Sequence, residues 1–159
     1  MNIEILCVGR IKEPYLKDAI GEYSKRLSKY CRLKITEVAD EKTIDKQSEA
    51  LDVQVRDKEC ERLMKAVRDN AYVIALAIEG ESMDSVAFSE LINDLAIRSV
   101  SDIQFVIGGS LGLGDAILKR ADMKLSFSRM TFPHQLMRVI LLEQIYRGYR
   151  IINHEPYHK

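Results

Sequence analysis

The sequence contains no tryptophan, only three prolines and three cysteines, and no long hydrophobic run. Cys7, Cys31 and Cys60 are widely spaced and form no CxxC pair, which argues against a disulfide framework or a structural zinc site. The longest apolar run, Ala71 to Ile78, is far shorter than the roughly 18 residues that a membrane span needs. The N-terminus also lacks a basic segment followed by an apolar core. We therefore expect a soluble cytoplasmic protein with reduced, buried cysteines and no membrane partner.

Excess charge of one sign is also missing, because 24 basic residues are balanced by 24 acidic ones. A nucleic-acid partner would therefore have to be held by a local patch, or by two copies of one. The charge is unevenly distributed along the chain. Residues 125–159 hold five basic and two acidic side chains and all three histidines, whereas the preceding 124 residues hold 19 basic and 22 acidic ones. We expect the chemistry of this protein at its C-terminal end.

Apolar strand-like runs alternate with amphipathic helical stretches, which is typical of an α/β domain with a mostly parallel sheet and helices on both faces. The predicted strands are Asn2 to Val8, Leu33 to Val38, Tyr72 to Ile78, Asp102 to Ile107 and Met123 to Phe127. The predicted helices are Tyr15 to Tyr30, Glu49 to Val67, Ser85 to Ile97 and Gln135 to Ile152. The polar stretch Ala39 to Gln47 indicates a surface connector. With no repeat or linker, residues 1–159 are predicted to form a single domain.

The helix predicted for Gln135 to Ile152 is apolar on most of its sides. Such a helix must be buried on most sides. In a domain of this size, the simplest arrangement packs one face on the sheet and the other on a second subunit. A homodimer is therefore expected, and two-fold dimers are the commonest oligomers.

A glycine-rich turn, residues 107–114, follows a predicted strand and precedes a helix, which is where open α/β sheets bind ligands. Its spacing is neither GxGxxG nor GxxxxGK[ST], and no acidic residue ends the following strand, so the dinucleotide and phosphate fingerprints are absent. The turn is either a plain tight turn or part of a pocket for a nucleoside-like ligand without phosphates. The turn at residues 76–81 and the loop at residues 127–132 end neighbouring strands and could complete such a pocket. Alternatively, Phe127 and Phe132 are core aromatics, and Ser128 and Thr131 are simple caps.

The three histidines do not form a recognisable catalytic or metal-binding pattern. HExxH and GxSxG are both absent, so the sequence favours neither a metalloprotease nor a serine hydrolase, and we expect no metal. His134 follows Pro133 at a predicted helix start and could cap the helix or line the pocket. If the C-terminal tail docks, His158 and Lys159 could contact a phosphate or a base edge.

Several motifs together resemble the ribosomal large-subunit pseudouridine N3-methyltransferases of the SPOUT class. They are Ile107-Gly108-Gly109 with Gly112-Leu113, Leu125-Ser126 with Met130 to His134, Arg138-Val139, Glu143-Gln144, Tyr146-Arg147 and Pro156-Tyr157-His158. The resemblance runs from Val8-Gly9 to the last residue. It implies a C-terminal trefoil knot, an obligate homodimer, S-adenosylmethionine as methyl donor, and large-subunit rRNA or the ribosome as partner. The knot is implied by the resemblance alone, because knots are rare among folds.

The resemblance also implies site residues. Donor contacts fall on Leu76, Gly108, Phe127, Ser128, Arg129, Met130, Thr131 and Phe132. On the acceptor side, we expect His158 to take the imide proton or to orient the base. Lys159 and Arg138 are expected to bind the RNA backbone, and Tyr157 either stacks on a base or packs the tail onto a partner subunit. Glu81 and Lys159 depart from the family, which often has lysine and arginine there.

Two other functions remain open at this point. One is a non-catalytic RNA-binding or ribosome-assembly module with the same fold. The other is a small nucleotide-binding oxidoreductase, which the absent dinucleotide fingerprint disfavours.

Overall fold

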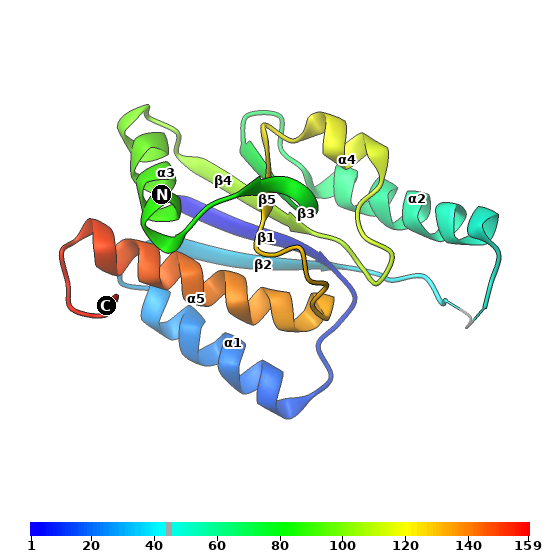
Figure 1. The fold of residues 1–159 in the computed structure, drawn as a ribbon, viewed down its shortest axis with the longest axis horizontal. Coiled ribbons are helices and arrows are strands. Elements are labelled where there is room, and N and C mark those ends of the chain that lie inside the picture. Colours follow the sequence, from blue (N-terminus) through cyan, green and yellow to red (C-terminus); the bar gives the residue numbers. More distant parts are fainter. Residues whose placement is uncertain (44–45) are drawn as a thin grey trace.

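A five-stranded, entirely parallel sheet forms the centre of the protein, in a computed structural model that describes residues 1–43 and 46–159 (Figure 1). The strand order is β2-β1-β4-β3-β5, and every neighbouring pair is parallel. Because the strands are parallel, their carboxyl ends all lie at one edge of the sheet. The strands are β1 (Asn2–Val8), β2 (Arg32–Val38), β3 (Tyr72–Ser82), β4 (Asp102–Ile107) and β5 (Met123–Ser126).

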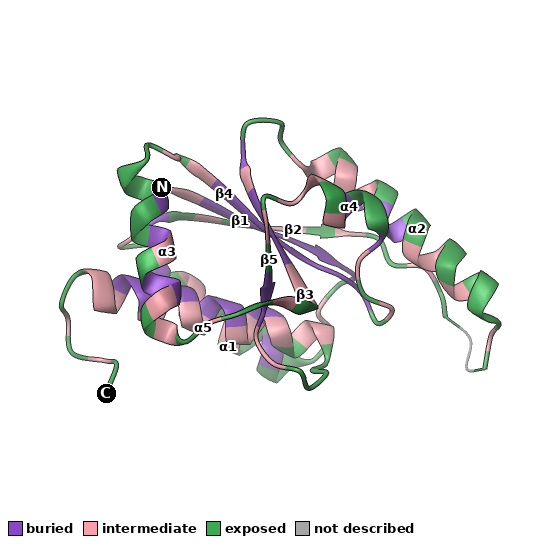
Figure 2. Cartoon of the chain, turned by 45° about the horizontal axis from the view of Figure 1, so that its top comes forward, coloured by how far each residue is buried: buried purple, intermediate pink, exposed green. Residues whose placement is uncertain are grey.

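Helices cover both faces of the sheet, as predicted. α1 (Pro14–Leu27), α3 (Ser85–Ile97) and α5 (His134–Ile152) pack on one face, and α2 (Glu49–Ala66) and α4 (Asp115–Arg120) pack on the other (Figure 1). Each face has its own core of buried aliphatic side chains, and the central strands β1 and β4 are buried along nearly their whole length (Figure 2). α5 lies between α1 and α3, so both sides of this apolar helix are packed within one chain.

The predicted elements are confirmed with small shifts at their ends. β1, β4 and α3 have the predicted bounds, whereas β3 continues four residues beyond Ile78. The extension is possible because β3 is irregular between Leu76 and Glu81, after which it pairs with β5 again. Gly80 lies at this irregularity, and a Cβ there would stand 2.7 Å from the backbone carbon of Lys124. Only glycine fits so close an approach between two backbones.

The remaining sequence predictions concern the connector and the cysteines. Residues 39–43 and 46–47 contain no helix or strand, and the rest of the predicted connector lies outside the described residues. All three cysteines are free and buried, as expected. Burial raises the pKa of the Cys7 and Cys31 thiols to about 11, so both stay protonated and unreactive near neutral pH. Among the described residues, no helix is long and apolar enough to cross a membrane.

Candidate functional site

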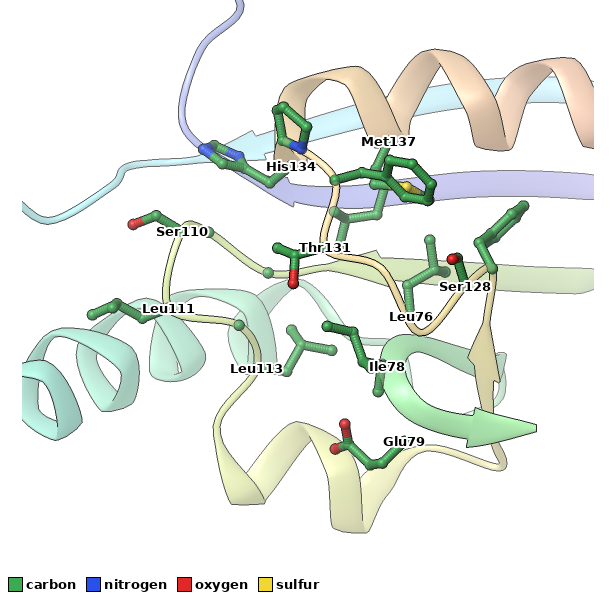
Figure 3. Close-up of a pocket in the computed structure, with 18 of the residues that line it drawn as sticks. Leu76, Ile78, Glu79, Ser110, Leu111, Leu113, Ser128, Thr131, His134 and Met137 are labelled. Carbon is green, nitrogen blue, oxygen red and sulfur yellow. The ribbon is translucent and has the colours of Figure 1, made fainter. Parts of the chain in front are cut away.

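A cavity of about 760 Å³ opens at the carboxyl edge of the sheet, where the second half of β3 and the loops after β4 and β5 meet the start of α5 (Figure 3). Its size suits a nucleoside-sized ligand. Seven of the eight predicted donor contacts line it, namely Leu76, Gly108, Phe127, Ser128, Met130, Thr131 and Phe132. Arg129 lies in the same loop but is exposed and is not among the lining residues. The structure therefore brings the three predicted segments to one cavity, but the segment predicted as a turn at residues 76–81 is part of β3.

The wall after β4 is built from glycine backbone. A Cβ on Gly108 would stand 2.5 Å from the carbonyl carbon and oxygen of Gly112, a distance that real Cβ atoms do not reach. Gly112 has a φ of +80°, which side chains rarely adopt, and its N–H donates to the Gly109 carbonyl at 3.1 Å. The loop is thus folded back on itself and leaves its surface open to a ligand.

The loop after β5 is held by its own serines. The Ser128 hydroxyl accepts a hydrogen bond from the Met130 N–H at 2.9 Å, and the Ser126 hydroxyl donates to the Ser128 carbonyl at 3.2 Å. Met130 and Phe132 remain substantially exposed, at 74% and 36%. Phe127, in contrast, packs against Phe88 in the core, so it serves both the core and the cavity wall. Both interpretations of this loop are therefore correct in part: Phe127 packs in the core, and the loop also forms part of the pocket wall.

His134 is the first residue of α5 and lines the cavity. Lining the pocket was one of its two predicted roles. Its Nδ1 atom is buried and has no hydrogen-bond partner among the described residues. Burial lowers the pKa of this imidazole, the positive charge of Arg138 lowers it further, and Asp40 opposes both. The imidazole at the cavity wall is therefore mostly neutral near neutral pH, and its unpartnered Nδ1 is buried.

Arg56 and Met137 also line the cavity, although neither was predicted from the sequence. Met137 follows His134 by one turn of α5, so its position could have been inferred once the helix start was known. Arg56 comes from α2, on the other face of the sheet. Nothing in the local pattern of that helix distinguishes it from the neighbouring charged residues.

Arg138 was predicted to bind the RNA backbone, and this prediction is wrong. Its side chain is 1% exposed, pairs with Glu37 at 2.8 Å, and donates to the carbonyls of Val8 and Gly9 at 2.7 and 2.8 Å. Gly9 turns the chain out of β1 with a φ of +82°. Arg138 therefore ties the start of α5 to the ends of β1 and β2, and it is not available to RNA.

Replacing Arg138 with lysine should lower the free energy of unfolding by about 2 kcal/mol, because a single ammonium group cannot reproduce the forked bonds to two carbonyls and a carboxylate. Denaturant unfolding of both proteins would measure this difference. Arg98→Lys, at an exposed position after α3, is the matched control and should change stability little. Equal stability of Arg138→Lys and the parent would contradict the structural role.

The C-terminal tail docks on the second half of α5. The Tyr157 hydroxyl donates to Glu143 at 3.1 Å, and its ring stacks edge-on against Tyr146 and lies 4.7 Å from the Arg147 guanidinium. Burial, followed by the negative charge of Glu143, raises the pKa of Tyr157 to about 12, so it remains a donor. Arg147 also lies 3.3 Å from Nδ1 of His158.

The structure does not bring the tail and the cavity together within one chain. The cavity includes the first turn of α5, whereas the tail folds back along the second half of the helix, from Glu143 to Arg150. Glu143 follows His134 by nine residues, which corresponds to about 14 Å along the helix axis. His158 and Lys159 are exposed. Among the described residues, no group of histidine, cysteine and acidic side chains is arranged to hold a metal ion.

Comparison with known proteins gives consistent results. The family model described as "Predicted SPOUT methyltransferase" matches residues 1–158. The ribosomal RNA large subunit methyltransferases H of Bifidobacterium adolescentis and Clostridium tetani are 62% and 58% identical to this chain, over the full length of each. Among solved structures, a probable methylase family protein from Haemophilus influenzae matches with a TM-score of 0.56 and 16% identity, covering 99% of this chain and 70% of that one. A probable methyltransferase from Bordetella pertussis matches with a TM-score of 0.54 and 11% identity, covering 92% and 95%.

Proposed function

The chain belongs to the SPOUT methyltransferase family, and on that premise we propose that it methylates large-subunit ribosomal RNA at N3 of a pseudouridine, with S-adenosylmethionine as the donor. The observation that carries the proposal is the cavity, whose wall combines glycine backbone with apolar side chains at the predicted donor positions. We take residues 1–159 to be one such domain, acting in the cytoplasm, where ribosomes are found.

The residues of the cavity fit this donor. S-adenosylmethionine carries no phosphate, which agrees with a glycine turn that lacks every phosphate-binding fingerprint. Because Gly108 has no side chain, the turn can close on the Gly112 backbone, and Leu76, Ile78 and Leu113 offer an apolar surface (Figure 3). When bound, S-adenosylmethionine supplies an electrophilic methyl group, and the task of the protein is to hold donor and acceptor in line.

On the acceptor side, we assign Tyr157, His158 and Lys159 to the RNA. Because an arginine always donates, Nδ1 of His158 is the acceptor in its contact with Arg147. Nε2 of His158 is then the nitrogen that remains for the base, where its N–H can donate to a carbonyl oxygen. Of the two roles predicted for His158, this contact favours orienting the base over removing its proton. Lys159 is free to meet a phosphate.

We further propose that the active form is a homodimer in which the tail of one subunit meets the cavity of the other. The proposal is supported by the distance between tail and cavity along α5, and by apolar side chains left exposed at the cavity end of α5 and on α1. These are Tyr15, Met130, Phe132 and Leu136. A dimer would also present the basic C-terminal segment, residues 125–159, twice. Two such patches could hold RNA although the net charge of the chain is zero.

The trefoil knot is part of the same proposal. The adjacency of β3 and β5, and the return of α5 across the sheet to pack between α1 and α3, are compatible with it. The family match supports a knotted C-terminal segment over an open one.

The proposed function is tested by incubating the protein with labelled S-adenosylmethionine and three substrates: free large-subunit rRNA, the isolated large subunit and the whole ribosome. We expect mass spectrometry of the digested RNA to find one labelled N3-methylpseudouridine in at least one of them. Large-subunit rRNA transcribed with uridine in place of pseudouridine is the matched control and should not be labelled at that position. If RNA binds in all three forms and no methyl group is transferred, the non-catalytic RNA-binding module becomes the better description.

A further inference from the structure

Glu59 is a buried carboxylate that lies directly behind the cavity wall. It belongs to α2, is 5% exposed, and does not itself line the cavity. One carboxylate oxygen, Oε2, accepts a hydrogen bond from the Glu41 N–H at 3.1 Å. The other, Oε1, lies 2.9 Å from the point where a Cβ on Gly109 would stand. The carboxylate is therefore wedged between residues 39–41 and the glycine turn.

This position is electrostatically unfavourable for an anion. Burial raises the pKa of Glu59, and the hydrogen bond from the Glu41 backbone opposes that rise. The neighbouring charges of Asp40 and Glu41 also raise it, and the positive charge of Arg62 lowers it. Arg62, however, directs its guanidinium to the Ala39 carbonyl and the Glu41 carboxylate. Burying a carboxylate with so little compensating positive charge costs desolvation free energy. A cationic ligand bound nearby would offset that cost.

The donor and the product of the proposed reaction differ in charge at one atom. S-adenosylmethionine has a positive sulfonium, and S-adenosylhomocysteine has a neutral thioether in its place. Donor and product contain the same adenosine and amino-acid groups. Contacts with those groups therefore cannot distinguish the positively charged donor from the product. A fixed negative charge behind the wall would favour the donor over the product.

We propose that Glu59 is the positioning residue that makes the cavity prefer the cationic donor to the neutral product, acting through the glycine turn at Gly109. The proposal rests on the proposed function of the cavity. Its consequence is that transfer of the methyl group removes the attraction and promotes product release. A Cβ at residue 109 would stand 2.9 Å from Oε1 of Glu59, so a side chain there would displace the carboxylate from the turn.

The test compares the affinities of Glu59→Gln and the parent protein for the donor and for the product, by calorimetry at mildly alkaline pH. Glutamine keeps the size and the acceptor for the Glu41 N–H but removes the charge. We expect the donor to bind about tenfold more weakly, as loss of a charge interaction across several ångströms of protein implies. Product affinity should change less than about twofold, so the donor-to-product preference falls. Glu61→Gln, on the exposed side of α2, is the matched control and should leave the preference unchanged.

Equal weakening of both ligands would assign Glu59 a merely structural role and overturn the proposal, as would no change in either. If Glu59→Gln does not fold, Glu59→Asp provides the test, because it keeps the charge but withdraws it from the turn by one methylene. The preference should then fall part of the way, and an unchanged preference overturns the proposal. Failure of the parent protein to bind S-adenosylmethionine at all would instead reject the proposed function.

Discussion

Replacing Gly108 with valine should weaken the binding of S-adenosylmethionine by about a hundredfold or more and reduce methyl transfer to background. A Cβ at this position would stand 2.5 Å from the Gly112 carbonyl, and that neighbour is backbone, which cannot swing aside. The turn must therefore move to relieve the collision, and a loss of about 3 kcal/mol of donor contacts corresponds to about two powers of ten in affinity. Calorimetry with the donor would measure the loss.

The control for this substitution is Gly21→Val. A Cβ on Gly21, in the exposed part of α1, would meet nothing within 4 Å. Donor affinity should therefore stay at the parent level in Gly21→Val. Thermal unfolding of both variants shows whether Gly108→Val still folds. A folded Gly108→Val protein with unchanged donor affinity would show that the donor does not use the glycine turn.

Deleting residues 157–159 should reduce methyl transfer by about a hundredfold or more while leaving donor affinity within about twofold of the parent. The deletion removes the three proposed acceptor contacts, and misplacement of an acceptor by about 1 Å is enough for losses of this size. The cavity is formed at the other end of α5 and should remain intact. Donor calorimetry and single-turnover methylation of the RNA substrate would separate the two effects.

The same deletion tests whether the site is shared between subunits. A mixed dimer of the tail deletion and Gly108→Val contains one cavity that is intact and, if the subunits exchange tails, one intact tail beside it. We therefore expect activity to reappear when the two inactive proteins are unfolded and refolded together. Absence of any recovery, with mixed dimers verified by differential tagging, would place tail and cavity in the same subunit.

The sequence predicted the architecture well because the alternation of apolar strands and amphipathic helices is a local signal. β1, β4 and α3 have the predicted bounds for this reason. β3 was predicted too short because Glu79, Gly80 and Glu81 have the composition of a turn. The strand continues only because Gly80 lets it approach β5, a tertiary contact that no local pattern encodes.

The general position of the cavity was predicted from the sequence, but the roles of the charged residues behind and around it were not. Strand-end glycines and the loop after β5 could be assigned to one edge of the sheet, since parallel strands place their carboxyl ends together. Arg138 was assigned to RNA as one of the basic residues of the C-terminal segment, whereas its partners Glu37, Val8 and Gly9 lie 101 to 130 residues away in sequence. Arg56 and Glu59 were missed for the same reason, because their contacts are long-range.

The length of α5 has a consequence for how this protein can vary. The first turn of the helix forms part of the cavity, and its second half carries Glu143, Arg147 and Arg150, which hold the tail. Inserting a single residue between them would turn the tail by about 100° and shift it by about 1.5 Å relative to the cavity. No loop lies between the two to absorb that rotation. The length of α5 therefore fixes both the distance and the rotation of the tail relative to the cavity. Among active homologues, we expect substitutions in this helix but neither insertions nor deletions.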